Sequence, residues 1–130
     1  TVADYNFLRK SVGWTEIEQT QAQTGIDHTA FLIAAVSDSK TVGMARVISD
    51  GGYVVVIADV IVHPDYQGMG IGKGLMQNVM SYINSSLKEG QCVLVNLMAA
   101  KGKELFYSQF GFTVRPNDTL GAGMTQWIKK

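Results

Sequence analysis

The sequence has little cysteine and proline, and its charges cancel. Its 130 residues include one cysteine and two prolines, and eleven Lys+Arg balance eleven Asp+Glu. The single cysteine, Cys92, excludes an internal disulfide framework and a cysteine-based zinc site. Zero net charge argues against a nucleic-acid binder that neutralises phosphates, because such proteins carry a basic excess. We therefore expect neither a metal nor a nucleic-acid partner.

Long apolar runs are also missing. No run reaches the roughly eighteen residues of a membrane span, and no signal peptide is visible. A composition of 46% hydrophobic and 17% charged residues is typical of a globular chain. Two domains would each be too small to hold a core, so we expect one domain over residues 1–130. We also expect a cytoplasmic protein with no membrane partner, and the first residue, Thr1, leaves open whether the N-terminus is native.

The first half of the chain is predicted to form two helices and then a β-meander. Residues 4–14 and 15–24 show helical spacing, and Gly25 is expected to end the second helix. Short turns then join β-rich stretches, which predicts antiparallel pairing. These stretches are residues 31–36, 41–48 and 53–63.

The second half is predicted to add a crossover. Apolar residues at helical spacing follow Pro64, and Gly90 is expected to close that helix. Strand, helix and strand in this order imply a right-handed parallel crossover. The remaining expectations are a strand at 92–98 with Cys92 buried, a helix at 101–110, and final strands at 112–114 and 124–128. The predicted fold is a mixed α/β single domain, with a mixed, mostly antiparallel central sheet, a parallel βαβ crossover and flanking helices.

A glycine-dense loop lies between the third predicted strand and the long helix. Four of the fourteen glycines fall within residues 68–74. Glycines let several backbone N–H groups turn toward one point, and the start of the following helix attracts an anion there. A tight turn that needs glycine for geometry alone is the alternative. The loop fits neither the P-loop pattern nor the dinucleotide pattern, so ATP and NAD are poor candidates.

The loop does fit the pattern Q-x-x-G-x-G, at Gln67, Gly70 and Gly72, preceded by V-x-P from Val62 to Pro64. This resembles the acetyl-CoA-binding segment of the GNAT superfamily of N-acetyltransferases. A second stretch, at 104–112, looks like the F-Y-x-x-x-G-F segment of that family. The resemblance covers roughly residues 30–115, and the two ends look like those of small bacterial members.

The resemblance implies direct transfer of an acetyl group from acetyl-CoA to the primary amine of a small-molecule acceptor, in a ternary complex. Backbone N–H groups would hold the pyrophosphate, and a splayed strand would align the pantetheine arm. The pyrophosphate residues implied are Gln67, Gly68, Met69, Gly70, Ile71, Gly72 and Lys73, and the pantetheine residues are Ile61 and Val62.

The resemblance also implies where protons move. Tyr107 matches the family tyrosine that protonates the leaving thiolate; packing beside its aromatic neighbours is the alternative. Ala58 stands where many relatives carry a glutamate base, so the neighbouring Asp59 becomes the candidate base. Asp59 could instead be a structural acid, and His63 or a water could serve as the base. Phe106 and Phe110 are expected in the core, with Tyr107 pointing elsewhere.

Because Ala58 replaces the expected glutamate, a non-catalytic acyl-CoA-binding or regulatory module of the same fold is the alternative function. The sequence leaves the identity of the amine acceptor open. It also leaves open a homodimer, to which a terminal strand at 124–128 would contribute.

Overall fold

A computed structural model describes residues 1–130, and the chain forms two compact units, Thr1–Leu97 and Met98–Lys130. The first unit contains the sheet and the three longest helices, and the second contains one short helix. None of the helices combines the length and the apolar character that a membrane crossing requires. One domain over the whole chain stays a prediction.

The sheet has four strands in the order β1-β2-β3-β4. The pairs β1–β2 and β2–β3 are antiparallel, and the pair β3–β4 is parallel. Helix α3 (Ile71–Ser86) makes the crossover between the parallel strands. The strands are β1 (Phe31–Ser37), β2 (Lys40–Ser49), β3 (Val54–Val62) and β4 (Leu94–Leu97). The predicted fold class, a mixed and mostly antiparallel sheet with one parallel crossover, is confirmed.

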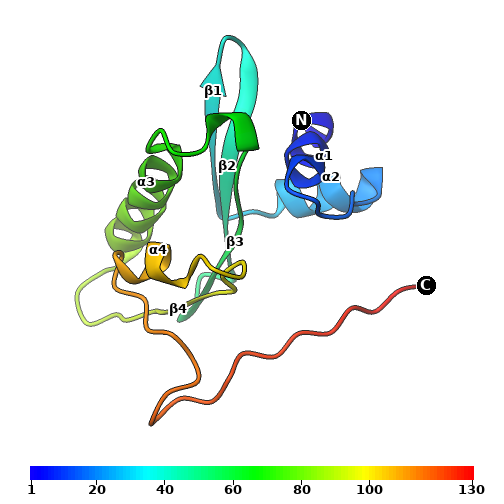
Figure 1. The fold of residues 1–130 in the computed structure, drawn as a ribbon. Helices are drawn as coiled ribbons and strands as arrows, with labels where there is room; N and C mark the ends of the chain where they lie inside the picture. Colours follow the sequence, from blue (N-terminus) through cyan, green and yellow to red (C-terminus); the bar gives the residue numbers. More distant parts are fainter. The chain divides into compact units, whose positions relative to one another are not determined.

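Helices cover both faces of this sheet (Figure 1). Helices α1 (Val2–Ser11) and α2 (Gln19–Asp27) lie on one face, and α3 lies on the other. On the first face, Leu8 is fully buried beside residues of β2 and β3. On the second, Met76 and Val79 of α3 are fully buried. Burying each such side chain contributes about 1.5–3 kcal/mol, so these contacts hold α1 and α3 to the sheet.

Several predicted helix bounds are wrong. Helix α1 ends at Ser11 rather than at residue 14, and α2 begins at Gln19 rather than at residue 15. Gly25 lies inside α2, which continues to Asp27 and brings Ile26 against the core. A glycine inside a helix costs only about 1 kcal/mol, which burial of Ile26 offsets. Helix α3 ends at Ser86, before the predicted stop at Gly90, because Leu87 already has extended backbone.

The fourth strand is shorter than predicted. It begins at Leu94, which pairs with Val54, the first residue of β3. Since β3 offers no partner before Val54, residues ahead of Leu94 stay outside the ladder. Cys92 is therefore exposed, and the expectation that it is buried is wrong.

The second unit contains α4 (Glu104–Ser108) but no strand. The prediction of strands at 112–114 and 124–128 is wrong. Strand propensity alone does not form a strand, because the backbone groups need a neighbouring strand for their hydrogen bonds. These segments have no such partner, and the side chains of Met124 and Ile128 are 90% and 79% exposed.

Candidate active site

The glycine loop connects β3 to α3 through a short 3-10 turn, Pro64–Tyr66. Gly68 and Gly70 have φ angles of 79° and 81°, in the left-handed region that other residues avoid. A Cβ at either position would meet no atom within 4 Å. These glycines therefore set the direction of the backbone rather than make space for a neighbour.

The loop presents a row of free backbone donors. The N–H groups of residues 68–73 donate to no other atom of the protein. Gly70 is the N-cap of α3, and no side chain caps the helix start. Free N–H groups at the positive end of a sixteen-residue helix make a binding place for an anion. Six of the seven predicted pyrophosphate residues, Gly68 to Lys73, thus form one segment of free donors, whereas the N–H of Gln67 already donates to the carbonyl of Pro64.

Beside this loop, strands β3 and β4 are no longer paired. Their parallel pairing ends at Ile57 and Leu97, whereas β3 continues to Val62. Ile61 and Val62 pair with β2 on one side and have no strand partner on the other. Their free edge can hydrogen-bond an extended ligand, as the resemblance implies for pantetheine.

Two contacts join the end of β3 to the loop and the start of α3. The side chain of Gln67 donates through Nε2 to the carbonyl of Val62, at 2.9 Å. Gly43 of β2 lies under the first turn of α3, where a Cβ would come within 3.3 Å of a side-chain carbon of Ile71 and 3.2 Å of the carbonyl of Ile61. Sequence reasoning missed Gly43, and its only signal is a glycine inside an apolar strand.

Asp59 lies in a buried ionic cluster on the α1 side of the sheet. Its carboxylate accepts hydrogen bonds from Arg9 Nη1 at 3.0 Å, from Arg46 Nε at 2.8 Å and from the Tyr5 hydroxyl at 2.7 Å. Its φ angle is 51°, where the β2–β3 register shifts between Met44 and Arg46. Burial, and then the bond to Asp59, raise the pKa of Tyr5.

Because both oxygens of Asp59 already have cationic partners, the geometry favours the structural alternative for this residue. Its role as general base stays a prediction. Sequence reasoning missed the cluster, although Arg46 gave a signal as the only charge inside an otherwise apolar predicted strand. If the Asp59 carboxylate is not the base, the remaining candidates are His63 and a water.

His63 directly follows β3 and caps the 3-10 turn Pro64–Tyr66. Its side chain is 19% exposed, and Nδ1 accepts a hydrogen bond from the backbone N–H of Asp65 at 3.2 Å. With Nδ1 accepting, the proton of a neutral imidazole lies on Nε2. The imidazole stacks on the ring of Phe7 from α1.

Tyr107 lies in the second unit, on α4. It is 9% exposed, and burial raises the pKa of its hydroxyl, which keeps the phenol protonated at neutral pH. The rings of Phe106 and Phe112 meet it edge-on at 5.0 and 6.5 Å. The expectation that Phe106 and Phe110 form the core while Tyr107 points elsewhere is wrong: Tyr107 is the buried residue and the two phenylalanines are half-buried. The amphipathic pattern of a five-residue helix is too short to set which face is buried.

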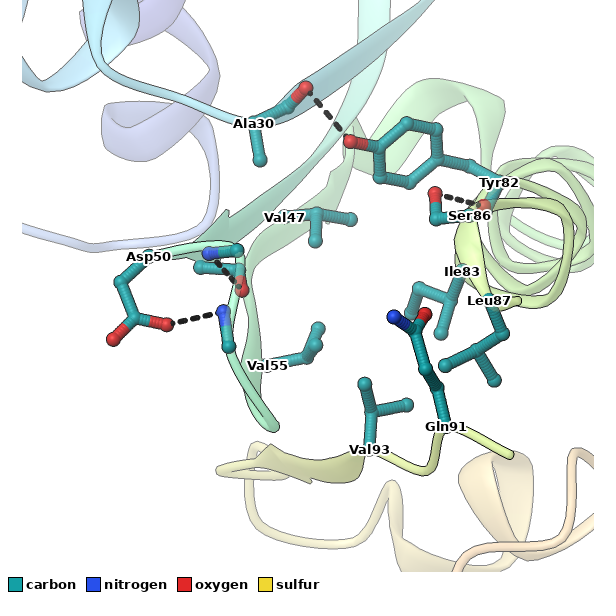
Figure 2. A pocket seen from close by; sticks show the side chains of 13 residues that line it. Ala30, Val47, Asp50, Val55, Tyr82, Ile83, Ser86, Leu87, Gln91 and Val93 are labelled. Carbon is teal, nitrogen blue, oxygen red and sulfur yellow. Dashed lines mark hydrogen bonds between the residues drawn. The ribbon is translucent and has the colours of Figure 1, made fainter. Parts of the chain in front are cut away.

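A cavity of about 350 Å³ lies at the other end of α3, beside the β2–β3 hairpin. Figure 2 shows aliphatic side chains around it, and a hydrogen bond of 3.2 Å from the Tyr82 hydroxyl to the carbonyl of Ala30. None of the predicted site residues lines it. No group of three or more His, Cys, Asp or Glu side chains is arranged to hold a metal.

Comparisons with known proteins agree with this geometry. Residues 27–114 match the model of the acetyltransferase (GNAT) domain, a span that includes β3, the glycine loop and α4. The chain therefore belongs to the GNAT family of acetyltransferases. The match also crosses the boundary between the two compact units.

Individual relatives of the chain include acetyltransferases. The chain is 30% identical over 118 residues to the uncharacterized N-acetyltransferase ycf52 of Porphyra purpurea, covering 88% of this chain and 66% of that protein. The chain thus spans slightly under two thirds of that relative's length. A solved structure of a Staphylococcus aureus protein of unknown function superposes with a TM-score of 0.84 and 32% identity, covering 97% of this chain and 93% of that one. A GNAT-family acetyltransferase from Streptococcus pneumoniae superposes with a TM-score of 0.77 and 26% identity, covering 100% and 92%.

Proposed function

We propose that this protein transfers an acetyl group from acetyl-CoA to the primary amine of a small-molecule acceptor, by direct attack in a ternary complex. One observation carries the proposal. The unpaired edge of β3 at Ile61–Val62 leads, through the five residues 63–67, into the free N–H groups of residues 68–73. The strand edge can pair with an extended arm, and the free N–H groups can bind a pyrophosphate at the end of that arm.

In the proposed reaction, the free amine attacks the thioester carbonyl carbon and the C–S bond breaks. The attacking nitrogen releases one proton as it becomes an amide, and the thiolate takes one proton. Tyr107 is the proposed donor of that proton, because its buried phenol is protonated at neutral pH. The ammonium must first lose a proton to Asp59, to His63 or to a water. Asp59 is already held by Arg9 and Arg46. The acceptor nitrogen of His63 is already occupied by the N–H of Asp65, so a water is the better-placed acceptor.

The same observation at Asp59 supports a second candidate function. A chain without a free carboxylate base can still bind acyl-CoA through its backbone donors. A non-catalytic acyl-CoA-binding or regulatory module is therefore the alternative. A cytoplasmic location and a homodimer remain proposals as well.

Thermal unfolding with acetyl-CoA, followed by thiol release, tests the proposal. A ligand at one hundred times its Kd stabilises the folded state by about 2.7 kcal/mol, so millimolar acetyl-CoA should raise the Tm by several degrees. A panel of primary amines should then release free CoA thiol. No shift at millimolar acetyl-CoA would refute cofactor binding, whereas a shift without thiol release for any amine would favour the binding module.

A further inference from the structure

Three aromatic rings meet where β3 leads into the glycine loop. The ring of Phe7, on α1, stacks on the imidazole of His63, with centroids 5.4 Å apart and 18° between the ring planes. Tyr66 contacts the same imidazole edge-on, at 6.0 Å and 79°. We call Phe7, His63 and Tyr66 the aromatic patch. It joins two elements that are more than fifty residues apart in the sequence.

The aromatic patch is continuous with the proposed cofactor site. His63 directly follows Val62, the last residue on the unpaired edge of β3. Tyr66 directly precedes Gln67, whose side chain holds the carbonyl of Val62. A molecule seated on the patch is therefore next to the strand edge at which the thioester is expected.

Phe7 is exposed although its helix has a well-formed buried face. Tyr5 and Leu8 of α1 are 7% and 0% exposed, whereas Phe7 is 53% exposed. Its neighbours one turn away on the helix are Ala3, Asp4, Lys10 and Ser11, so α1 adds only one methyl group to the exposed apolar surface of the ring here. A protein interface needs about 800 Å² from each partner, which one ring does not supply. The size of the patch fits a small molecule.

The charge beside the aromatic patch suits a cation. The Asp65 carboxylate lies 3.9 Å from His63 Nδ1, and its side chain is 83% exposed. Aromatic faces attract cations, and they also stack with other planar rings. An amine acceptor is a cation before it loses its proton, so the patch and Asp65 are complementary to it.

We infer that the aromatic patch binds the amine acceptor and selects an amine that carries a planar aromatic ring. This inference rests on the proposed function. The ring of the acceptor stacks on the exposed face of Phe7, and the ammonium is attracted by Asp65. Phe7 is then a specificity-determining residue, whereas the backbone donors of the loop serve the cofactor.

Two amines of equal charge and similar size test this inference: 2-phenylethylamine and 2-cyclohexylethylamine, titrated into the protein by calorimetry or NMR. Stacking predicts that the aromatic amine binds roughly three- to tenfold more tightly. Phe7→Leu should reduce that preference to about onefold, and Phe7→Tyr, which keeps the ring, should retain it. Tyr53→Leu is the matched control, because Tyr53 is 65% exposed and precedes the opposite end of β3.

Equal binding of the two amines, or binding of neither, would overturn the inference. A preference that survives in Phe7→Leu would overturn it too, since residues other than Phe7 would then recognise the aromatic ring of the amine. Because both titrations are done without acetyl-CoA, they decide the inference separately from the proposed function. Failure of acetyl-CoA to raise the Tm would count against the proposed function alone.

Discussion

Arg46 Nε donates a 2.8 Å hydrogen bond to Asp59 Oδ2 at the place where the β2–β3 ladder changes register. The same guanidinium donates through Nη1 to the carbonyl of Gly25 and to the hydroxyl of Thr29, each at 2.9 Å. One arginine thus connects the strand that carries the proposed cofactor edge to the end of α2. Arg9 adds α1 to the same carboxylate.

Asp59→Asn should destabilise the protein strongly. The side chains of Asp59, Arg9 and Arg46 are 10%, 8% and 11% exposed, so the substitution leaves two nearly buried cations without their anion. Removing one partner of a buried ion pair costs about 3–5 kcal/mol. Urea unfolding measures the loss. Asp38→Asn is the matched control, because Asp38 also has positive φ, at 48°, but is exposed, and it should change stability little.

The same variant separates the two roles of Asp59. If the residue is structural, the fraction of Asp59→Asn that is folded should retain most of its turnover. A general base contributes about 10²–10⁴-fold, so a loss of that size in fully folded protein would assign catalysis to Asp59. Turnover measured well below the unfolding midpoint distinguishes these results.

Gly70→Ala and Gly74→Ala should have opposite effects. Neither new methyl group would meet an atom within 4 Å, so the difference comes from the backbone. Gly70 has a φ of 81°, and an alanine there should destabilise by about 1–2 kcal/mol and weaken acetyl-CoA binding. Gly74 is inside α3, where alanine should stabilise by up to about 1 kcal/mol. Urea unfolding measures the stability of both variants, and acetyl-CoA titration measures their cofactor affinity. Equal behaviour of the two variants would contradict the proposed role of the loop geometry.

Much of this site follows from the sequence because it is made by local backbone geometry. Gly68 and Gly70 mark left-handed positions, and a glycine-dense loop before an amphipathic helix places free N–H groups at the helix start. The partners of Asp59 do not follow in the same way, since Arg9 lies fifty residues away and only the tertiary fold brings it there. The strand expected at 124–128 does not form for the same reason, because whether a strand forms depends on a distant neighbour.

Alkaline pH should unfold the protein partly through Tyr5. Burial and the Asp59 hydrogen bond raise its pKa above 10.0 in the folded state. The folded state therefore binds this proton more tightly than the unfolded state does. Its contribution is complete below about pH 10 and is lost as the pH rises through the folded pKa.

The measurement is the Tm between pH 8 and pH 12 (approximate limits set by the tyrosine pKa). Tyr5→Phe should be less stable at neutral pH, because it loses a hydrogen bond, but should lose less stability above about pH 10. Tyr53→Phe, at an exposed position, should follow the unsubstituted protein. An equally steep alkaline decline in Tyr5→Phe would show that other groups cause it.

Tyr107→Phe should lower turnover with little change in acetyl-CoA affinity. The substitution removes only the hydroxyl and keeps the ring that packs against Phe106 and Phe112. Loss of a general acid predicts a decrease of about 10²–10⁴-fold in kcat. Steady-state kinetics with a saturating amine measures it. An unchanged kcat would return Tyr107 to a packing role.

The free N–H row at residues 68–73 has a consequence for how this protein can diverge. Each donor belongs to the main chain, so side chains such as Met69, which is 68% exposed, can be exchanged without removing a donor. Changes of residue type at such positions are therefore a poor indicator of lost cofactor binding. Acceptor choice depends instead on side chains such as Phe7, so a single substitution can change the acceptor while the acyl donor stays the same.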